Sequence, residues 1–459
     1  MKDKLIQQAL ERRLRQTGDG APPASLADVS RHARAVPEQF YRFDQHPGYQ
    51  QLRIMHDGAA RFGLANPFFK LHESLAGAET TIGGKRFVNF ASYNYLGYSG
   101  HPLVAEAAKA AIDHYGTSVS ASRLVSGDRP IHRELEAELA RLYEVDDAVT
   151  FVSGHATNVT TIGYLFGPRD LVIHDELIHN SVLQGIQLSG ARRLSFAHND
   201  FDALDRLLGD QRQHFERVLV VLEGIYSMDG DYPDLPRFVE LKNNHKVFLM
   251  VDEAHSLGVM GANGKGIREH FGLAGKDVDI WMGTLSKTLA SCGGYIAGSA
   301  ALAAVLKATA GGFVYSVGLA PVLTASAIAS LDILEGEPER VAALRRNGSL
   351  FLKLAQEAGL DTGLSAGFSV VPVLVGDSLR AVQLSNDLLA AGINALPIIH
   401  PAVPEGMARL RFFITSEHTE DQIRQTVALT AEKLKDLTER NFGLASIDVQ
   451  QMMKMLAAR

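Results

Sequence analysis

The 459-residue sequence has very little cysteine and no excess of positive charge, and each shortage excludes a class of protein. Its single cysteine, Cys292, cannot form a disulfide within the chain and leaves no cysteine cluster for a structural zinc. We therefore expect a reducing compartment, most simply the cytoplasm. Lys and Arg (45) are outnumbered by Asp and Glu (52), and the net charge of −7 argues against a nucleic-acid-binding surface of the basic kind.

Long apolar segments are also scarce. The first twenty residues, MKDKLIQQALERRLRQTGDG, carry charges throughout and do not resemble a secretory signal. Only the stretch between Lys307 and Asp332 is uncharged over a length sufficient to cross a bilayer. Its glycines, serines and threonines favour a loop followed by a buried helix that begins at Pro321, with a membrane span as the weaker alternative. We therefore expect no transmembrane segment.

In the centre of the chain, short apolar and β-branched runs alternate with helical patterns. The runs expected to form strands are residues 148–152, 171–174, 192–197, 217–224, 246–253 and 279–285. This alternation predicts an α/β fold with a mainly parallel sheet covered by helices on both faces. After about residue 335 the pattern indicates a smaller α+β domain.

The pattern divides the chain into four parts. They are an N-terminal extension and arm (1–90), a large domain (91–334), a small C-terminal domain (335–440) and a tail helix (441–459). The extension includes an aromatic-rich arm from Pro37 to Gly58, expected to pack on the main domain in preference to docking a partner, and a β-hairpin around Gly83-Gly84. The tail is expected to pack against the body or a second subunit, with a membrane-surface helix as the alternative.

Chemistry-bearing residues follow the expected strands. In an open α/β sheet, ligands bind beyond the carboxyl ends of the strands, so these positions are candidates for a site. They are Ser153, Gly154, His155, His179, Ser227, Asp252, His255, Thr284, Ser286 and Lys287. A lysine, a carboxylate and two histidines are therefore predicted to meet at one edge of the sheet.

Each of these residues also has a plainer interpretation. Lys287 can form a Schiff base, but most lysines after a strand are solvated. Asp252, at the end of an apolar strand, requires a cation such as a protonated pyridine ring, or it caps a helix or forms a salt bridge. Ser153-Gly154 can seat a phosphate at a helix start, and His179 can stack on a flat cofactor or cap a helix. His132 and Glu136 lack a third ligand, so we predict no metal site.

Taken in order, the motifs resemble the α-oxoamine synthases, a family of fold-type I enzymes that use pyridoxal 5′-phosphate (PLP). The resemblance runs from about Asn66 to Leu437. Its segments are NYLG (94–97), SRLVSGDRPIHRELEAELA (122–140), SGHATN (153–158), DELIHNS (175–181), HND (198–200), EGIYSMDGD (223–231), DEAHSLGVMG (252–261), GTLSKTLASCGGY (283–295) and ARLRFFITSEHT (408–419).

The resemblance implies a role for each candidate residue. Lys287 is similar to the Schiff-base lysine, Asp252 to the partner of the pyridine nitrogen, His179 to the ring-stacking residue and His255 to a partner of the phenolic oxygen. The phosphate site is expected at Ser153, Gly154, His155, Thr284 and Ser286. Asn94, Ser227 and Arg411 match positions that hold the amino-acid carboxylate, and Ser122 matches the side-chain pocket.

The implied reaction is a decarboxylating Claisen condensation of a small amino acid with an acyl thioester, giving an α-amino ketone. A small residue at position 122 favours serine or alanine, with glycine as an alternative. The acyl donor is expected to be a CoA ester or an acyl-carrier protein, and the uncharged segment Ala308 to Leu331 favours a homodimer. The rival interpretation is another fold-type I PLP enzyme, such as an aminotransferase or an aldolase.

Overall fold

The computed structural model describes residues 36–53 and 63–444. The chain divides into two compact units, with the boundary between Ala65 and Asn66. The first contains two short 3-10 turns, Glu38–Phe40 and Phe43–Gln45. The start of the N-terminal extension (1–35) and most of the expected tail helix (445–459) lie outside the described residues, and the packing of the aromatic arm stays a prediction.

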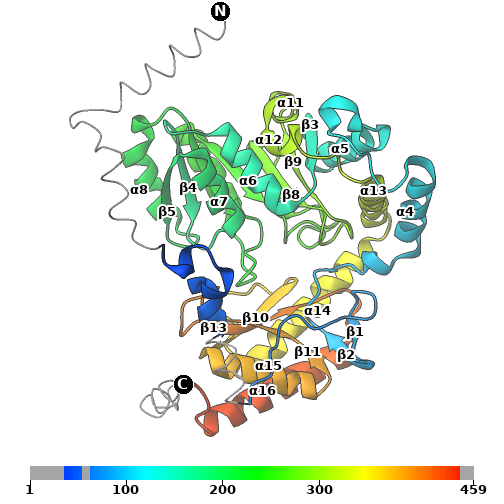
Figure 1. Cartoon of the computed structure of the whole chain (residues 1–459), viewed down its shortest axis with the longest axis vertical. Coiled ribbons are helices and arrows are strands. Elements are labelled where there is room, and N and C mark those ends of the chain that lie inside the picture. Colours follow the sequence, from blue (N-terminus) through cyan, green and yellow to red (C-terminus); the bar gives the residue numbers. More distant parts are fainter. Residues whose placement is uncertain (1–35, 54–62, 445–459) are drawn as a thin grey trace, which may run out of the picture. The chain divides into compact units, whose positions relative to one another are not determined.

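A seven-stranded sheet forms the middle layer of the larger part of the second unit (Figure 1). Its strands are β3 (Asp147–Phe151), β4 (Leu171–Asp175), β5 (Arg192–Phe196), β6 (Val218–Glu223), β7 (Phe248–Asp252), β8 (Ile280–Thr284) and β9 (Gly294–Gly298). Their order is β3-β9-β8-β7-β6-β4-β5, and only the pairs that involve β9 are antiparallel. The mainly parallel sheet is confirmed, and every run expected to be a strand forms one. The glycine-containing β9 was not predicted.

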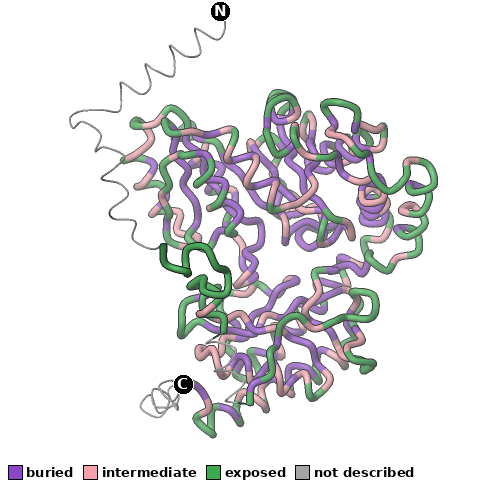
Figure 2. The backbone as a smooth tube through the Cα atoms, viewed as in Figure 1, coloured by how far each residue is buried: buried purple, intermediate pink, exposed green. Residues whose placement is uncertain are grey.

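Helices cover both faces of this sheet, and the strands are buried between them (Figure 2). One face packs against α6 (Gly154–Leu165), α7 (Asn180–Ser189), α11 (Ala300–Thr309) and α12 (Gly311–Val314). The other packs against α5 (Pro130–Tyr143), α8 (Phe201–Gln211), α9 (Leu235–His245), α10 (Ile267–Phe271) and α13 (Pro321–Gly336). Side chains of β6 alternate between the two cores: Leu219 lies in one core and Val220 in the other. A strand buried on both faces is apolar at nearly every position, which explains the almost continuous runs.

The C-terminal part contains a second, antiparallel sheet. Its strands are β10 (Val370–Gly376), β13 (Ala408–Phe413) and β12 (Leu396–Ile398), and its helices are α14 (Pro338–Glu357), α15 (Ser378–Ala390) and α16 (Glu420–Glu439). The hairpin formed by β1 (Glu79–Ile82) and β2 (Lys85–Asn89) has the expected turn at Gly83-Gly84.

The hairpin pairs with a strand that lies far away in the sequence. β2 runs parallel to the short strand β11 (Ile393–Asn394), with Val88 opposite Ile393. The hairpin, which we assigned to the N-terminal extension, therefore shares a sheet with the C-terminal part. Helix α4 (Pro102–Tyr115) follows it and packs on α13.

The uncharged segment before Asp332 folds as expected, with a helix that begins at Pro321. The hydroxyls of Thr324, Ser326 and Ser330 donate hydrogen bonds of 2.8–3.0 Å to carbonyls one turn earlier. These bonds let polar side chains lie buried inside a helix. Among the described residues, no helix combines the length and the apolar character that a bilayer crossing requires.

Candidate active site

A cavity of about 180 Å³ opens at the carboxyl ends of β3, β4, β6, β7 and β8. Its lining residues are Ser153, Gly154, His155, Asn158, His179, Ser181, Glu223, Asp252, Ala254, His255, Met282, Thr284, Ser286 and Lys287. The structure thus brings together nine of the ten cofactor-binding residues proposed from the sequence. The tenth, Ser227, lies beside the cavity: its N–H group donates to Glu223 at 3.2 Å.

Lys287 is enclosed in this cavity. Its Nζ lies 2.9 Å from Nε2 of His255 and 5.6 Å from the centre of the Tyr93 ring. Burial lowers the pKa of Lys287 to about 8, although the carboxylates of Asp252 and Glu223 oppose the shift. An amine with this pKa is unprotonated far more often at neutral pH than an ordinary lysine, so Lys287 is suited to act as a nucleophile and base.

His255 connects Lys287 to the buried Tyr95. The hydroxyl of Tyr95 lies 2.7 Å from Nδ1 of His255, and burial together with the nearby Lys287 holds the pKa of His255 well below its ordinary value. The imidazole is therefore neutral. If the ammonium of Lys287 donates to Nε2, the ring proton lies on Nδ1 and is donated to Tyr95.

Asp252 begins a chain of hydrogen bonds that ends at His179. Its Oδ1 accepts the backbone N–H group of Ala254 at 3.0 Å, and its Oδ2 accepts Nδ2 of Asn158 at 2.9 Å. Asn158 also donates to Ser181, whose hydroxyl lies 2.7 Å from Nδ1 of His179. Burial lowers the pKa of His179, with Asp252 opposing the shift. The chain fixes the orientation of the histidine ring relative to the carboxylate.

The expected phosphate seat forms where α6 meets β8. Ser153 caps α6, with its Oγ 3.4 Å from the N–H group of Ala156. A Cβ atom at Gly154 would lie 2.8 Å from Oγ1 of Thr284, so only glycine allows this close approach. Thr284 in turn accepts the N–H group of Ser286 at 3.2 Å. A helix N-terminus flanked by hydroxyl groups is suited to a phosphate.

Two arginines on β13 have different environments. Arg409 is buried and forms an ion pair with Asp229 at 2.5 Å. Arg411 donates from Nη1 to the carbonyl of Ser227 at 2.8 Å and lies over the ring of Phe413, but its buried Nε has no hydrogen-bond partner among the described residues. Arg411 therefore retains donors for a ligand.

The side chains of Asn94 and Ser122 do not line the cavity of this chain. Nδ2 of Asn94 donates to the carbonyl of Ala76 at 2.7 Å and to Ser99 at 2.9 Å, so its amide organises a turn. Its neighbour Tyr93 faces Lys287 instead. A substrate role for Asn94 stays a prediction, and Tyr93, which directly precedes the NYLG motif, is a residue that sequence reasoning missed.

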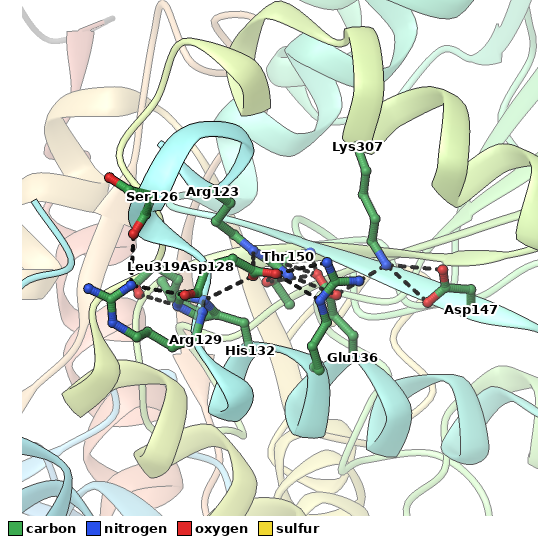
Figure 3. Close-up of polar contacts among 11 residues, drawn as sticks. Arg123, Ser126, Asp128, Arg129, His132, Glu136, Asp147, Thr150, Lys307 and Leu319 are labelled. Carbon is green, nitrogen blue, oxygen red and sulfur yellow. Dashed lines mark hydrogen bonds and ion pairs between the residues drawn. The ribbon is translucent and has the colours of Figure 1, made fainter. Parts of the chain in front are cut away.

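Ser122 leads into a turn that is fixed by buried charges (Figure 3). Arg123 binds Glu136 through both terminal nitrogens and Asp128 through Nε at 2.7 Å. Lys307 lies 3.1 Å from Glu136, and Nε2 of His132 lies 2.7 Å from the carbonyl of Leu319. His132 and Glu136 thus hold the loops at Ser122 and Leu319 against β3. The role of Ser122 in a side-chain pocket stays a prediction.

Asn158, Ser181, Glu223 and Tyr95 were also missed as site residues. Each is a polar residue inside one of the motifs quoted from the sequence. The motif therefore indicated the region of the site, but only the folded chain shows which polar residues of a motif lie at the cavity.

Comparisons with known proteins identify the family. Residues 85–429 match the family Aminotransferase class I and II. An 8-amino-7-oxononanoate synthase of Symbiobacterium thermophilum is 38% identical over 381 residues, which covers 83% of this chain and 96% of that protein. A related synthase of Bacillus subtilis is 37% identical, covering 80% and 92%. The chain belongs to the α-oxoamine synthases.

Solved structures agree with this assignment. The structure of this α-oxoamine synthase is similar to that of serine palmitoyltransferase from S. paucimobilis with PLP and myriocin bound, at a TM-score of 0.81 and 29% identity. The similarity covers 85% of this chain and 98% of the other. Serine palmitoyltransferase of Sphingomonas wittichii gives the same values. The fold-type I architecture expected from the sequence is confirmed.

Proposed function

We propose that this α-oxoamine synthase condenses a small amino acid with an acyl thioester, releases carbon dioxide and forms an α-amino ketone. The family makes it a PLP-dependent acyltransferase that performs a decarboxylating condensation. The observation that carries the proposal is the meeting of Lys287, Asp252 and His255 in one cavity, with the donors of Arg411 nearby.

The residues of the cavity fit PLP. Asp252 provides a fixed carboxylate for the pyridine nitrogen, the start of α6 with Thr284 provides a phosphate seat, and Lys287 provides an amine of lowered pKa. The buried Oδ1 of Asn158 has no hydrogen-bond partner among the described residues, which is consistent with a ligand in the cavity. When bound, PLP supplies an electron sink that stabilises negative charge on the α-carbon of an amino acid.

The side chains of the cavity accept the proton and bind the substrate. Lys287, unprotonated, accepts the proton that leaves the α-carbon, and the neutral His255 holds its Nζ in place at 2.9 Å. Arg411 binds the amino-acid carboxylate, because a guanidinium can donate to both oxygens at once. His179, whose orientation is fixed by Ser181, would cover one face of the pyridine ring of PLP. The remaining walls limit the access of water.

Serine and alanine are the favoured amino acids, with glycine as a third candidate, and the acyl donor is a CoA ester or an acyl-carrier protein. The decisive assay incubates the holoenzyme with each amino acid and a panel of acyl thioesters, followed by mass spectrometry. An amino acid labelled at its carboxyl carbon should release labelled carbon dioxide only when a thioester is present. Formation of a 2-oxo acid with no thioester requirement would overturn the proposal in favour of an aminotransferase.

We further propose a homodimer. Leu124, Val125, Tyr315 and Val317 are apolar and exposed in the single chain, and the N–H group of Gly318 donates to the carbonyl of Ala121 at 3.0 Å, which joins their two loops. A second copy is the partner that would cover them, and it would bring the Ser122 loop to an interface. Sedimentation should give a dimer at micromolar concentration. A fully active monomer would refute this proposal.

A further inference from the structure

Two carboxyl groups line the cavity, and only Asp252 has been given a role so far. Glu223, on β6, lies opposite Asp252 in the parallel register of β6 and β7 and is 3% exposed. Its Oε2 accepts the N–H group of Ser227 at 3.2 Å, whereas its buried Oε1 has no hydrogen-bond partner among the described residues. A buried polar atom without a partner destabilises the fold, so the position calls for a bound group.

The surroundings of Glu223 favour its neutral form. Burial and the adjacent Asp252 together raise the pKa of Glu223 to about 8, and Lys287, Arg411 and the backbone N–H groups of Ser227 and His179 oppose the shift. Both oxygens of Asp252 already accept N–H donors, from Ala254 and Asn158, which is the arrangement that suits an ionised carboxylate. Two neighbouring buried carboxyl groups do not both ionise easily. Glu223 therefore carries the proton at neutral pH, and the proton lies on Oε1 because Oε2 is an acceptor.

The strand order determines which edge of a bound ring Glu223 faces. The phosphate seat lies at the ends of β3 and β8, Asp252 lies on β7, and Glu223 lies on β6, beyond Asp252. In PLP the phosphate arm and the 3-oxygen are on opposite edges of the pyridine ring. A ring that places its nitrogen at Asp252 and its phosphate at the α6 terminus therefore turns its 3-oxygen edge toward β6.

We propose that Glu223 is a positioning residue for the cofactor, a neutral carboxylic acid whose Oε1 donates a hydrogen bond to the 3-oxygen of PLP, the phenolic oxygen that His255 is also expected to contact. This inference rests on the proposed roles of Asp252 and Lys287. The bond satisfies the unpartnered oxygen and holds the ring against the Asp252 side of the cavity. Because Glu223 shares the turn of Ser227, it also links the cofactor to the carbonyl that Arg411 contacts.

The bond has a spectroscopic consequence. A donor stabilises the anionic 3-oxygen most strongly when the nitrogen joined to Lys287 carries no proton, because a protonated nitrogen already offsets the charge on that oxygen. Glu223 thus lowers the pKa of the nitrogen. Removing the donor should raise the pH at which the visible absorbance of the holoenzyme changes.

The experiment titrates the visible absorbance of the holoenzyme with pH in wild type, Glu223→Ala, Glu223→Gln and Glu253→Gln. The amide of Glu223→Gln keeps an N–H donor. Glu253 is the matched control, because it is fully buried beside Asp252 but binds Ser256 and the N–H group of Ile267 and does not line the cavity.

The midpoint should rise by about one pH unit in Glu223→Ala, a tenfold change in proton affinity. It should stay within about 0.3 unit in the two glutamine variants. An unchanged midpoint in Glu223→Ala, or equal shifts in all three variants, would overturn the inference. Absence of the visible band from wild type after addition of PLP would instead refute the role of Lys287.

A second readout does not depend on catalysis. The infrared spectrum of the holoenzyme should contain the C=O stretch of a buried protonated carboxyl group that titrates near pH 8. Burial also raises the pKa of Glu253 to about 7, so the band of Glu223 is identified as the one that is lost from Glu223→Gln and kept in Glu253→Gln. If no band is lost from Glu223→Gln, the proton resides on another carboxyl group and the inference fails.

Discussion

Replacing Arg411 by alanine removes the guanidinium that we assign to the amino-acid carboxylate. Nη1 of Arg411 donates to the carbonyl of Ser227 and to Sδ of Met228, and the buried Nε has no hydrogen-bond partner among the described residues. Loss of a charged hydrogen-bonded pair in an enclosed site costs about 2–4 kcal/mol, which corresponds to a rise in the amino-acid KM of about 30- to 1,000-fold. Because the same carboxylate leaves as carbon dioxide, its alignment also affects the chemical step, so kcat should fall as well.

Arg409 offers the matched control, since it lies two residues away on the same strand. Arg409→Ala breaks the buried ion pair with Asp229 and should lower the free energy of unfolding by about 3 kcal/mol, with KM within about threefold of wild type. Steady-state kinetics and denaturant unfolding separate the two effects. Cofactor absorbance should be unchanged in both variants, because Lys287 and Asp252 are untouched. A normal KM in Arg411→Ala together with a raised KM in Arg409→Ala would refute the assignment and identify Arg409 as the carboxylate ligand.

Two further predictions test the cofactor anchor and the electrostatics. Lys287→Ala should lose the visible absorbance band that borohydride bleaches in the wild-type holoenzyme, and retention of that band would contradict the role of Lys287. Burial opposes charge on His198, but the carboxylates of Asp175 and Asp231, each at 2.8 Å, outweigh it and raise its pKa to about 10. Because the pKa is higher in the folded protein, charged His198 stabilises the fold. This stabilisation is complete below the unfolded pKa of about 6.5 and is lost as the pH rises toward 10. The stability deficit of His198→Asn, measured by denaturant unfolding, should therefore shrink between these values, and a constant deficit would count against it.

The sequence by itself determined the layers of the large domain and the family. Strands β4, β6 and β7 are buried on both faces, so their runs are apolar up to the polar residues at their carboxyl ends and are recognised without knowledge of their neighbours. The catalytic candidates were found because residues that follow parallel strands must meet at one edge of the sheet. Lys287, Asp252 and His255 meet there.

Only the tertiary structure decided which members of each motif face the cavity. Tyr93 and Asn94 are adjacent in the sequence, yet Tyr93 faces Lys287 while Asn94 binds a carbonyl in its own turn. Arg409 and Arg411 share a face of β13. Asp229, about 180 residues earlier, forms an ion pair with Arg409, whereas Arg411 keeps unused donors.

Long-range pairing also decided the neighbours of an element that the sequence predicts locally. The hairpin joins the C-terminal part because β2 pairs with β11, some 300 residues later. The protonation state of Glu223 also depends on the pairing of distant segments. Its sequence neighbours are apolar, and its charge state follows from burial beside Asp252, a residue that the register of β6 and β7 brings alongside. Local patterns encode burial and periodicity, whereas the partners of a side chain depend on contacts between segments that the sequence keeps far apart.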